Sequence, residues 1–165
     1  YFLLRPVKSQ FMVSFRYVKS YALVSIVILL IMLTTLILDY SKPIGFFNVL
    51  AFVVSFLMGT VLWYSVDFII SSSCFWFKNF SVSGWLSHEI LKFSTRPDSI
   101  YTGILRKVLF SMIPMVLIAS IPTRTLLYGP NYHYLIWQLF MAMTFLLLTR
   151  IIWRRGLLRY ESASS

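Results

Sequence analysis

Four long apolar stretches, joined by short polar segments, dominate the pattern along this chain. The first covers about 21–38, and the second covers about 46–70 with an apolar extension toward Phe77. A helix over the first stretch would be about 27 Å long, close to the hydrocarbon thickness of a bilayer, about 30 Å. Because lipid offers the backbone no hydrogen bonds, each stretch is expected to cross the membrane as a helix.

The third stretch is too short in its strictly apolar part. Residues 108–121 would form a helix of about 21 Å, which does not cross the hydrocarbon core. A helix that begins at Tyr101 would reach about 31 Å, and Arg106 and Lys107 would then extend to the inner surface. Pro114 is expected to kink this helix, because proline cannot donate the backbone hydrogen bond.

The fourth stretch covers about 134–153 and has aromatic residues at both ends, which is typical of a membrane-spanning helix. These residues are Tyr128, Tyr132, Tyr134 and Trp137 at the outer end and Trp153 at the inner end. The pattern therefore predicts an all-α fold, a polytopic membrane helix bundle with four transmembrane helices.

Two connections contain helix-breaking residues. Segment 39–45 contains proline and glycine, so it is expected to turn the chain in a first outer loop. Segment 121–130 is apolar but contains Pro122, Gly129 and Pro130. We expect it to be a broken, re-entrant segment that dips into the outer leaflet, where protein or a wet cavity must cover its backbone.

A short amphipathic helix is predicted over 82–93, within a loop (71–103) that is expected to be cytoplasmic or interfacial. Its apolar side chains recur at helical spacing, and its polar ones lie mostly off that stripe, as in helices that lie in a membrane interface. The apolar positions are Val82, Trp85, Leu86, Ile90 and Phe93, and the polar ones are Ser87, His88, Glu89 and Lys92.

The distribution of Lys and Arg sets an orientation. Of the fifteen in the chain, only Lys42 and Arg124 lie in the connections 39–45 and 121–133, and the other thirteen lie in 1–20, 71–107 and 150–165. Short loops rich in Lys and Arg stay in the cytoplasm, so both ends of the chain are expected inside.

The composition indicates an integral membrane protein. The chain is 59% hydrophobic and 12% charged, against about 25% charged in soluble domains. We expect one membrane domain over 1–165. A net charge of +10 raises the question of nucleic acid, but here the charge lies beside apolar spans, so topology and anionic lipid headgroups explain it better. The one cysteine, Cys74, excludes an internal disulfide, and its aromatic neighbours suggest a buried thiol.

No motif for catalysis, a cofactor or a metal is present. The six glycines are isolated, so no phosphate-binding GxxxxGK or GxGxxG occurs, and the chain is not expected to bind ATP itself. His88 and Glu89 begin like the zinc motif HExxH, but Lys92 stands where the second ligand is needed.

Two charged residues are predicted within the spans, Asp67 and Arg150. They lie near the inner ends of the second and fourth stretches, at similar depth. A charge in lipid is costly, so the two side chains either form an ion pair or extend separately to the interface.

Uncharged polar and small residues also lie within the spans. Gln138 and Thr149 either line a pathway or form hydrogen bonds between helices. Ser55 and Gly59 are four residues apart, which lets another helix approach closely, although small residues also occur at such spacing by chance.

Motifs along nearly the whole chain resemble the membrane subunits of bacterial ABC-type exporters, and more narrowly a little-characterised branch of the type-2 ABC permeases. Their order and spacing carry the resemblance, and Arg96 departs from it where members often have an aromatic residue. The motifs are LRPV at 4–7, FW at 75–76, F-x-x-R-P-x-x-I-Y at 93–101, LR at 105–106, IP at 113–114, Pro122 with LLYG at 126–129, and GLLRYESAS at 156–164.

The resemblance implies a transport subunit in the bacterial inner membrane. Members usually have six membrane helices, so the chain is expected to be a C-terminal fragment that lacks the first two. Two permease subunits, identical or related, would pair, and each would dock a separate ATPase subunit that binds ATP and drives export.

The resemblance also implies roles for two segments. Segment 1–20 would contact the ATPase as a coupling segment, although a plain interfacial helix would have the same basic amphipathic pattern. Segment 122–129 would match the short re-entrant helices that close the outer face. The residues concerned are Arg5, Lys8 and Arg16 in the first, and Pro122, Arg124 and Gly129 in the second.

Two other functions remain open at this point. A membrane-embedded lipid-modifying enzyme would need acidic or histidine side chains near the interface, and His88, Glu89 and Asp98 are the candidates. A non-catalytic membrane scaffold would only bind partners.

Overall fold

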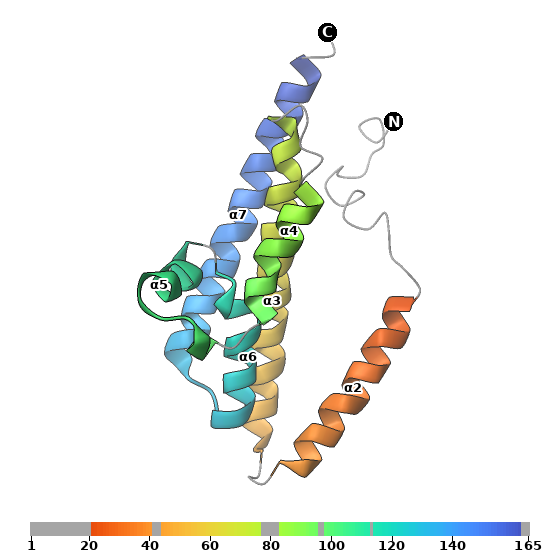
Figure 1. Ribbon diagram of the computed structural model, residues 1–165, viewed down its shortest axis with the longest axis vertical. Helices are drawn as coiled ribbons and strands as arrows, with labels where there is room; N and C mark the ends of the chain where they lie inside the picture. Colours follow the sequence, from red (N-terminus) through yellow and green to blue (C-terminus); the bar gives the residue numbers. More distant parts are fainter. Residues whose placement is uncertain (1–20, 41–43, 77–82, 96–97, 113, 163–165) are drawn as a thin grey trace. The chain divides into compact units, whose positions relative to one another are not determined.

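The computed structural model describes residues 21–40, 44–76, 83–95, 98–112 and 114–162. The chain divides into two compact units, Tyr1–Pro43 and Ile44–Ser165. The described part of the first unit is the helix α2 (Tyr21–Asp39), which matches the first predicted span. All further elements belong to the second unit and are helical in its described residues (Figure 1).

Two long helices of the second unit confirm the second and fourth predicted spans. Helix α3 (Phe46–Ser72) continues into a 3-10 turn, η1 (Ser73–Phe75), and α7 is Tyr132–Ser162. With α2, they are the described single helices that are long and apolar enough to cross a membrane. The all-α membrane helix bundle is thereby confirmed.

The third predicted span is not one kinked helix. It consists of α5 (Gly103–Ser111) and α6 (Val116–Tyr128), whose axes differ by 91°. Pro114 lies in the break and is fully buried. Because proline has no N–H, it cannot bond the carbonyl of Phe110 four residues earlier. Trp137 of α7 supplies the missing donor, with 3.1 Å between its Nε1 and the Phe110 oxygen.

The prediction that Pro122 breaks the following segment is wrong, because α6 runs through it to Tyr128. Pro122 leaves the carbonyl of Ile118 without its helical donor. That carbonyl faces Gly59 of α3 so closely that a Cβ on Gly59 would lie 2.6 Å from the Ile118 oxygen. The freed carbonyl is therefore covered by another backbone, and α6 remains a helix until Gly129, whose φ of 91° ends it.

Helix α3 packs against both α6 and α7 (Figure 1). Its buried residues are mostly three or four positions apart, which places them on one side of the helix. Two apolar clusters pack against α3. One, around Val66 and Met115, joins α3 to α5 and α6, and the other, around Leu62 and Leu117, joins α3 to α6 and α7. The buried residues of α3 are Ser55, Gly59, Leu62, Ser65, Val66, Phe68 and Ser72.

The predicted amphipathic helix is α4 (Ser83–Lys92), followed by the 3-10 turns η2 (Phe93–Thr95) and η3 (Asp98–Ile100). It packs against α3. The predicted faces are partly wrong, because Ser87 is buried and Trp85 is 63% exposed. Ser87 turns inward because it donates a hydrogen bond to Asp67 of α3.

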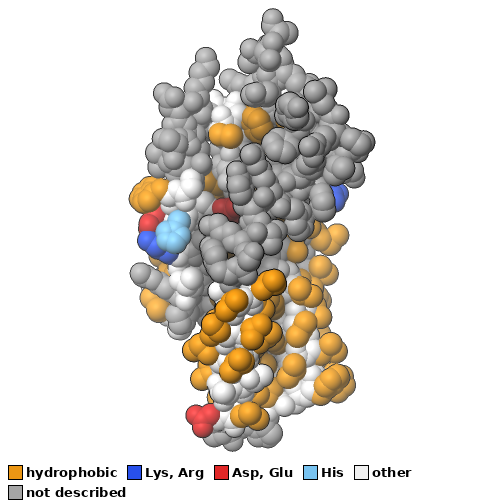
Figure 2. Space-filling model, turned by 90° about the vertical axis from the view of Figure 1, so that its right-hand side faces the viewer, with side chains coloured by type: hydrophobic (Ala, Val, Ile, Leu, Met, Phe, Trp, Pro, Cys, Tyr) orange, Lys and Arg blue, Asp and Glu red, His pale blue; other side chains and the backbone are white. Residues whose placement is uncertain are grey.

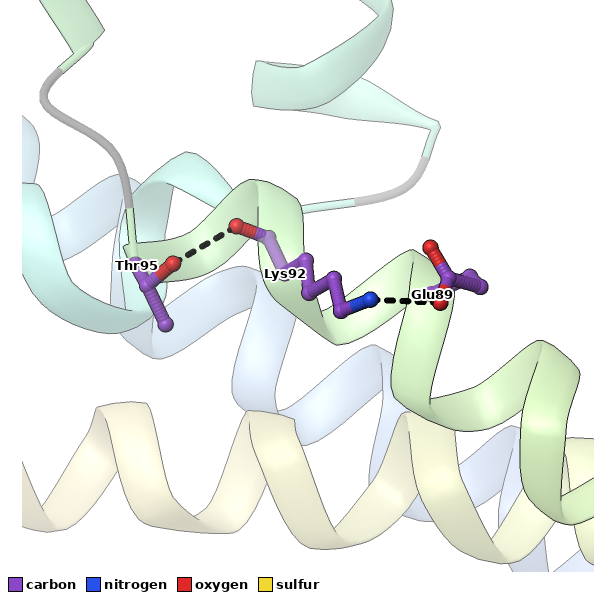
Figure 3. Close-up of polar contacts among 3 residues, drawn as sticks. All are labelled: Glu89, Lys92 and Thr95. Carbon is purple, nitrogen blue, oxygen red and sulfur yellow. Dashed lines mark hydrogen bonds and ion pairs between the residues drawn. The ribbon is translucent and has the colours of Figure 1, made fainter.

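The outward side of α4 carries polar groups beside the exposed Trp85. Figure 3 shows the Lys92 side chain extending back to Glu89, with 2.5 Å between Nζ and Oε1, and Thr95 donating to the Lys92 carbonyl at 2.8 Å. The prediction of a buried Cys74 is wrong, since this thiol is exposed on η1.

The surface is apolar where a bilayer would contact it. Large hydrophobic side chains are about half exposed along the long helices, for example Phe56 of α3 at 51% and Phe140 of α7 at 56%. The described side chains on the face in Figure 2 are mostly hydrophobic. Such a surface is stable in lipid and not in water.

Replacing Gly59 by alanine should separate α3 from α6, because the added Cβ would collide with a backbone oxygen that cannot rotate away. We expect a loss of about 1–3 kcal/mol in the free energy of unfolding, the usual cost of overpacking. Thermal unfolding in detergent micelles measures it. The matched control is Gly84→Ala in α4, where a Cβ would meet nothing within 4 Å. Equal stability of the two variants would contradict the close approach.

Candidate functional site

The centre of the bundle is a polar cluster around Gln138 of α7, which is fully buried. Its Nε2 donates to the carbonyl of Ser55 in α3 at 2.9 Å and to the carbonyl of Leu117 in α6 at 2.8 Å. Its Oε1 accepts a hydrogen bond from the Ser55 hydroxyl at 2.7 Å. One side chain therefore joins three helices, and we call Ser55, Leu117 and Gln138 the Gln138 cluster.

A second polar contact joins α3 and α7 further along. Thr149 is fully buried, and its hydroxyl lies 3.3 Å from the Ser65 carbonyl and 2.8 Å from the carbonyl of Phe145 in its own helix. Gln138 and Thr149 thus bond between helices, the second of the two interpretations that the sequence allowed. The small residues Ser55 and Gly59 are both at helix contacts.

Asp67 and Arg150 are not brought together. Asp67 is half-buried and accepts the hydrogen bond from Ser87, whereas the Arg150 side chain is exposed on α7. Since a carboxylate hydrogen bond stabilises Asp67 locally, its charge does not require the arginine.

Aromatic rings close the end of the bundle at which α3 finishes. The Trp153 ring of α7 lies between Phe68 and Phe75, with ring centroids 5.2 Å and 5.4 Å away. Phe75 also lies over Gly156, where a Cβ would come within 2.4 Å of the ring. We call these four residues the Trp153 cluster.

The loop that follows α4 is closed at its two ends. The Tyr101 hydroxyl donates to the Phe93 carbonyl at 3.0 Å, and the two rings lie 6.2 Å apart. Tyr101 is buried beside Val66 and Met115. The first and last residues of the F-x-x-R-P-x-x-I-Y motif are therefore in contact.

At the opposite end, a cavity of about 560 Å³ opens where α6 turns into α7. Gly129 ends α6, and Asn131 begins α7 by accepting hydrogen bonds from the backbone of His133 through its side chain and of Leu135 through its carbonyl. We call it the α6–α7 cavity. Its lining residues are Ile121, Arg124, Thr125, Tyr128, Gly129, Pro130, Asn131, Tyr132, His133 and Tyr134.

The second unit is thus a helix bundle with a polar centre and a cavity at one end. In a comparison with known families, the sequence profile described as "ABC-2 family transporter protein" matches residues 1–164. This chain belongs to the ABC-2 transporter family. It is thus a membrane subunit, the permease, of an ABC transport system. Comparisons with curated proteins and with solved structures gave no match.

The predicted site residues of this ABC-2 permease are spread over the bundle. Arg124 and Gly129 line the α6–α7 cavity, whereas Pro122 is buried inside α6. Arg5, Lys8 and Arg16 lie outside the described residues. The sequence pattern did not predict that Trp137 and Ser87 donate hydrogen bonds between elements.

Of the three residues considered for an enzyme, the structure describes the side chains of His88 and Glu89, and the Asp98 side chain lies outside the described part. Glu89 is paired with Lys92, and His88 is exposed. In the part of the chain that the structure describes, no group of three or more His, Cys, Asp or Glu side chains is placed to hold a metal.

A double-mutant cycle on the Gln138 cluster should show that Ser55 and Gln138 act together. Ser55→Ala and Gln138→Leu each remove the hydroxyl–amide bond, so the double variant should lose less stability than the sum. We expect a coupling of about 0.6 kcal/mol, up to about 1.7 kcal/mol, as for other buried hydrogen bonds between membrane helices. Unfolding in micelles measures it, and Thr60→Val, which removes an exposed bond within α3, is the control. Strict additivity would disprove the contact.

Stability should depend on Ser87 and not on Arg150. Ser87→Ala removes a hydrogen bond to a carboxylate, so we expect a loss of about 1.5–3 kcal/mol in unfolding free energy. Arg150→Gln changes an exposed side chain and should stay within about 0.5 kcal/mol of the parent. A large effect of Arg150→Gln that vanishes in an Asp67→Asn background would instead establish the ion pair.

Proposed function

We propose that this permease is the membrane subunit of an ATP-driven export system of the bacterial inner membrane. It would form the substrate path together with a second permease subunit, identical or related. A separate ATPase subunit would dock on its cytoplasmic side and bind the ATP. The observation that carries the proposal is membership of the ABC-2 family over 1–164, in a chain whose sequence has no nucleotide-binding motif.

The orientation follows from charge. Helix α7 has Arg150, Arg154 and Arg155 near the end that carries the Trp153 cluster, and no Lys or Arg near its other end. Lys and Arg favour the cytoplasmic side. The Trp153 cluster and α4 would therefore lie inside, the α6–α7 cavity outside, and both ends of the chain in the cytoplasm.

This orientation suggests a route from ATPase to membrane. Segment 1–20, with Arg5, Lys8 and Arg16, and helix α4 would both lie on the inner side, within reach of a docked subunit. The Ser87–Asp67 bond would pass movement of α4 to α3. The close contact of Gly59 with α6 and the Gln138 cluster would pass it onward to α6 and α7.

The alternatives have less support. A lipid-modifying enzyme would need His88 and Glu89 to be available, but the Glu89 carboxylate is paired with Lys92. A non-catalytic scaffold would need no ATPase at all, so it differs from the exporter in what it binds.

Co-purification tests the proposal. The tagged permease should retain an ATPase subunit from its native membrane, and ATP turnover should appear in that complex and not in the permease alone. Replacing Arg5, Lys8 and Arg16 together by alanine should reduce the retained ATPase, because a basic contact surface is lost. Lys42→Ala, in the loop expected outside, is the matched control. Activity of the permease alone would favour an enzyme, and absence of both would favour a scaffold.

A further inference from the structure

We propose that the α6–α7 cavity binds the phosphate group of an anionic phospholipid, whose acyl chains lie along the adjoining face of α7. The inference concerns a binding site and does not depend on the direction or the substrate of transport. It rests on the charge of the cavity, on its size, and on the apolar surface that continues from it.

The charge of the cavity favours an anion. Arg124 is the one lining residue with a formal charge, and the lining contains no Asp or Glu. Its side chain is half-buried, so its field is screened less than that of an exposed cation. A guanidinium presents a fork of N–H donors that matches the oxygens of a phosphate.

The remaining lining supplies neutral donors and aromatic surface. Tyr128 and Tyr132 lie at the rim, 80% and 73% exposed, and His133 is exposed beside them. Tyrosine has an apolar ring and a hydroxyl that can donate to a phosphate oxygen, which suits the headgroup level of a membrane. The volume of about 560 Å³ is within the usual range for small-molecule sites, about 300–1,000 Å³.

An apolar stripe leads away from the cavity along α7. Ile136, Phe140 and Met143 follow Tyr132 at steps of four, four and three residues, which places them on one helix face. They are 67%, 56% and 59% exposed. A phosphate in the cavity would place its acyl chains on this stripe, toward the middle of the bilayer.

The stripe favours a lipid over a soluble phosphate. A free phosphate would use Arg124 and the rim and would gain nothing from Ile136, Phe140 and Met143. A phospholipid would use both parts, because its acyl chains pack against the stripe while the bilayer holds its phosphate at the headgroup level, beside the cavity. The chemistry shared by the two ligands is the phosphate, so the test has to separate them by the acyl chains.

The experiment uses the full chain in nanodiscs of phosphatidylcholine with a minor fraction of phosphatidylglycerol that carries a photoreactive headgroup. After illumination, mass spectrometry compares labelling of the 121–134 peptide with labelling of the 150–162 peptide. We expect Arg124→Gln to reduce labelling of the 121–134 peptide about tenfold, because at least one charge-assisted hydrogen bond is lost. Labelling of the 150–162 peptide should stay unchanged. Arg154→Gln, an exposed arginine at the other end of α7, is the matched control and should leave labelling of the 121–134 peptide unchanged.

Further arms keep the test decisive. Phe140→Gln should also weaken labelling of 121–134, although it leaves every lining residue in place. Arg124→Lys should retain part of the labelling, and it replaces Arg124→Gln if that variant does not fold.

Excess glycerol phosphate should not displace the lipid. Displacement, or no effect of Phe140→Gln, would assign the cavity to a soluble anion, and equal labelling of Arg124→Gln and parent would overturn the site.

Discussion

Hydrocarbon cannot form hydrogen bonds, so every polar group that is freed inside this bundle needs a partner from the protein itself. The two prolines of the third span make this requirement acute, because each removes a backbone donor in the middle of the bundle. The carbonyl released by Pro114 accepts the Trp137 indole N–H. The carbonyl released by Pro122 is shielded from lipid by its close contact with the Gly59 backbone, which is cover and not a hydrogen bond. In the described residues no buried side-chain nitrogen or oxygen lacks a partner.

The same requirement explains how α3 holds the other helices. Apolar packing alone hardly distinguishes one helix from another in lipid, because the acyl chains are equally apolar. The choice of helix partner comes instead from hydrogen bonds. The Gln138 cluster joins α3, α6 and α7 at one level, and Thr149 joins α3 and α7 at a second level. Two levels of hydrogen bonds define both the register and the rotation of this helix pair.

The long helices were predictable from the sequence because length and hydropathy decide them, and α2, α3 and α7 match the predicted spans. The path of the third span was not predictable. Whether Pro114 kinks or breaks a helix, and whether Pro122 is tolerated within one, depends on donors and small residues far away in the sequence, Trp137 and Gly59. Likewise, the depth of Asp67 suggested a charged partner, but nothing in the sequence indicated that Ser87 of a separate helix would reach it. These contacts join residues far apart in the sequence, so the local pattern of residues does not predict them.

The exposed thiol on η1 has a practical consequence. Cys74 is the one cysteine in the whole sequence and lies next to the Trp153 cluster. A spin label or fluorophore could be attached there without altering the chain, at the junction where α3 ends beside α7. The mobility and polarity that such a probe senses would report changes in packing at this junction, in the unmodified sequence and in its native lipid.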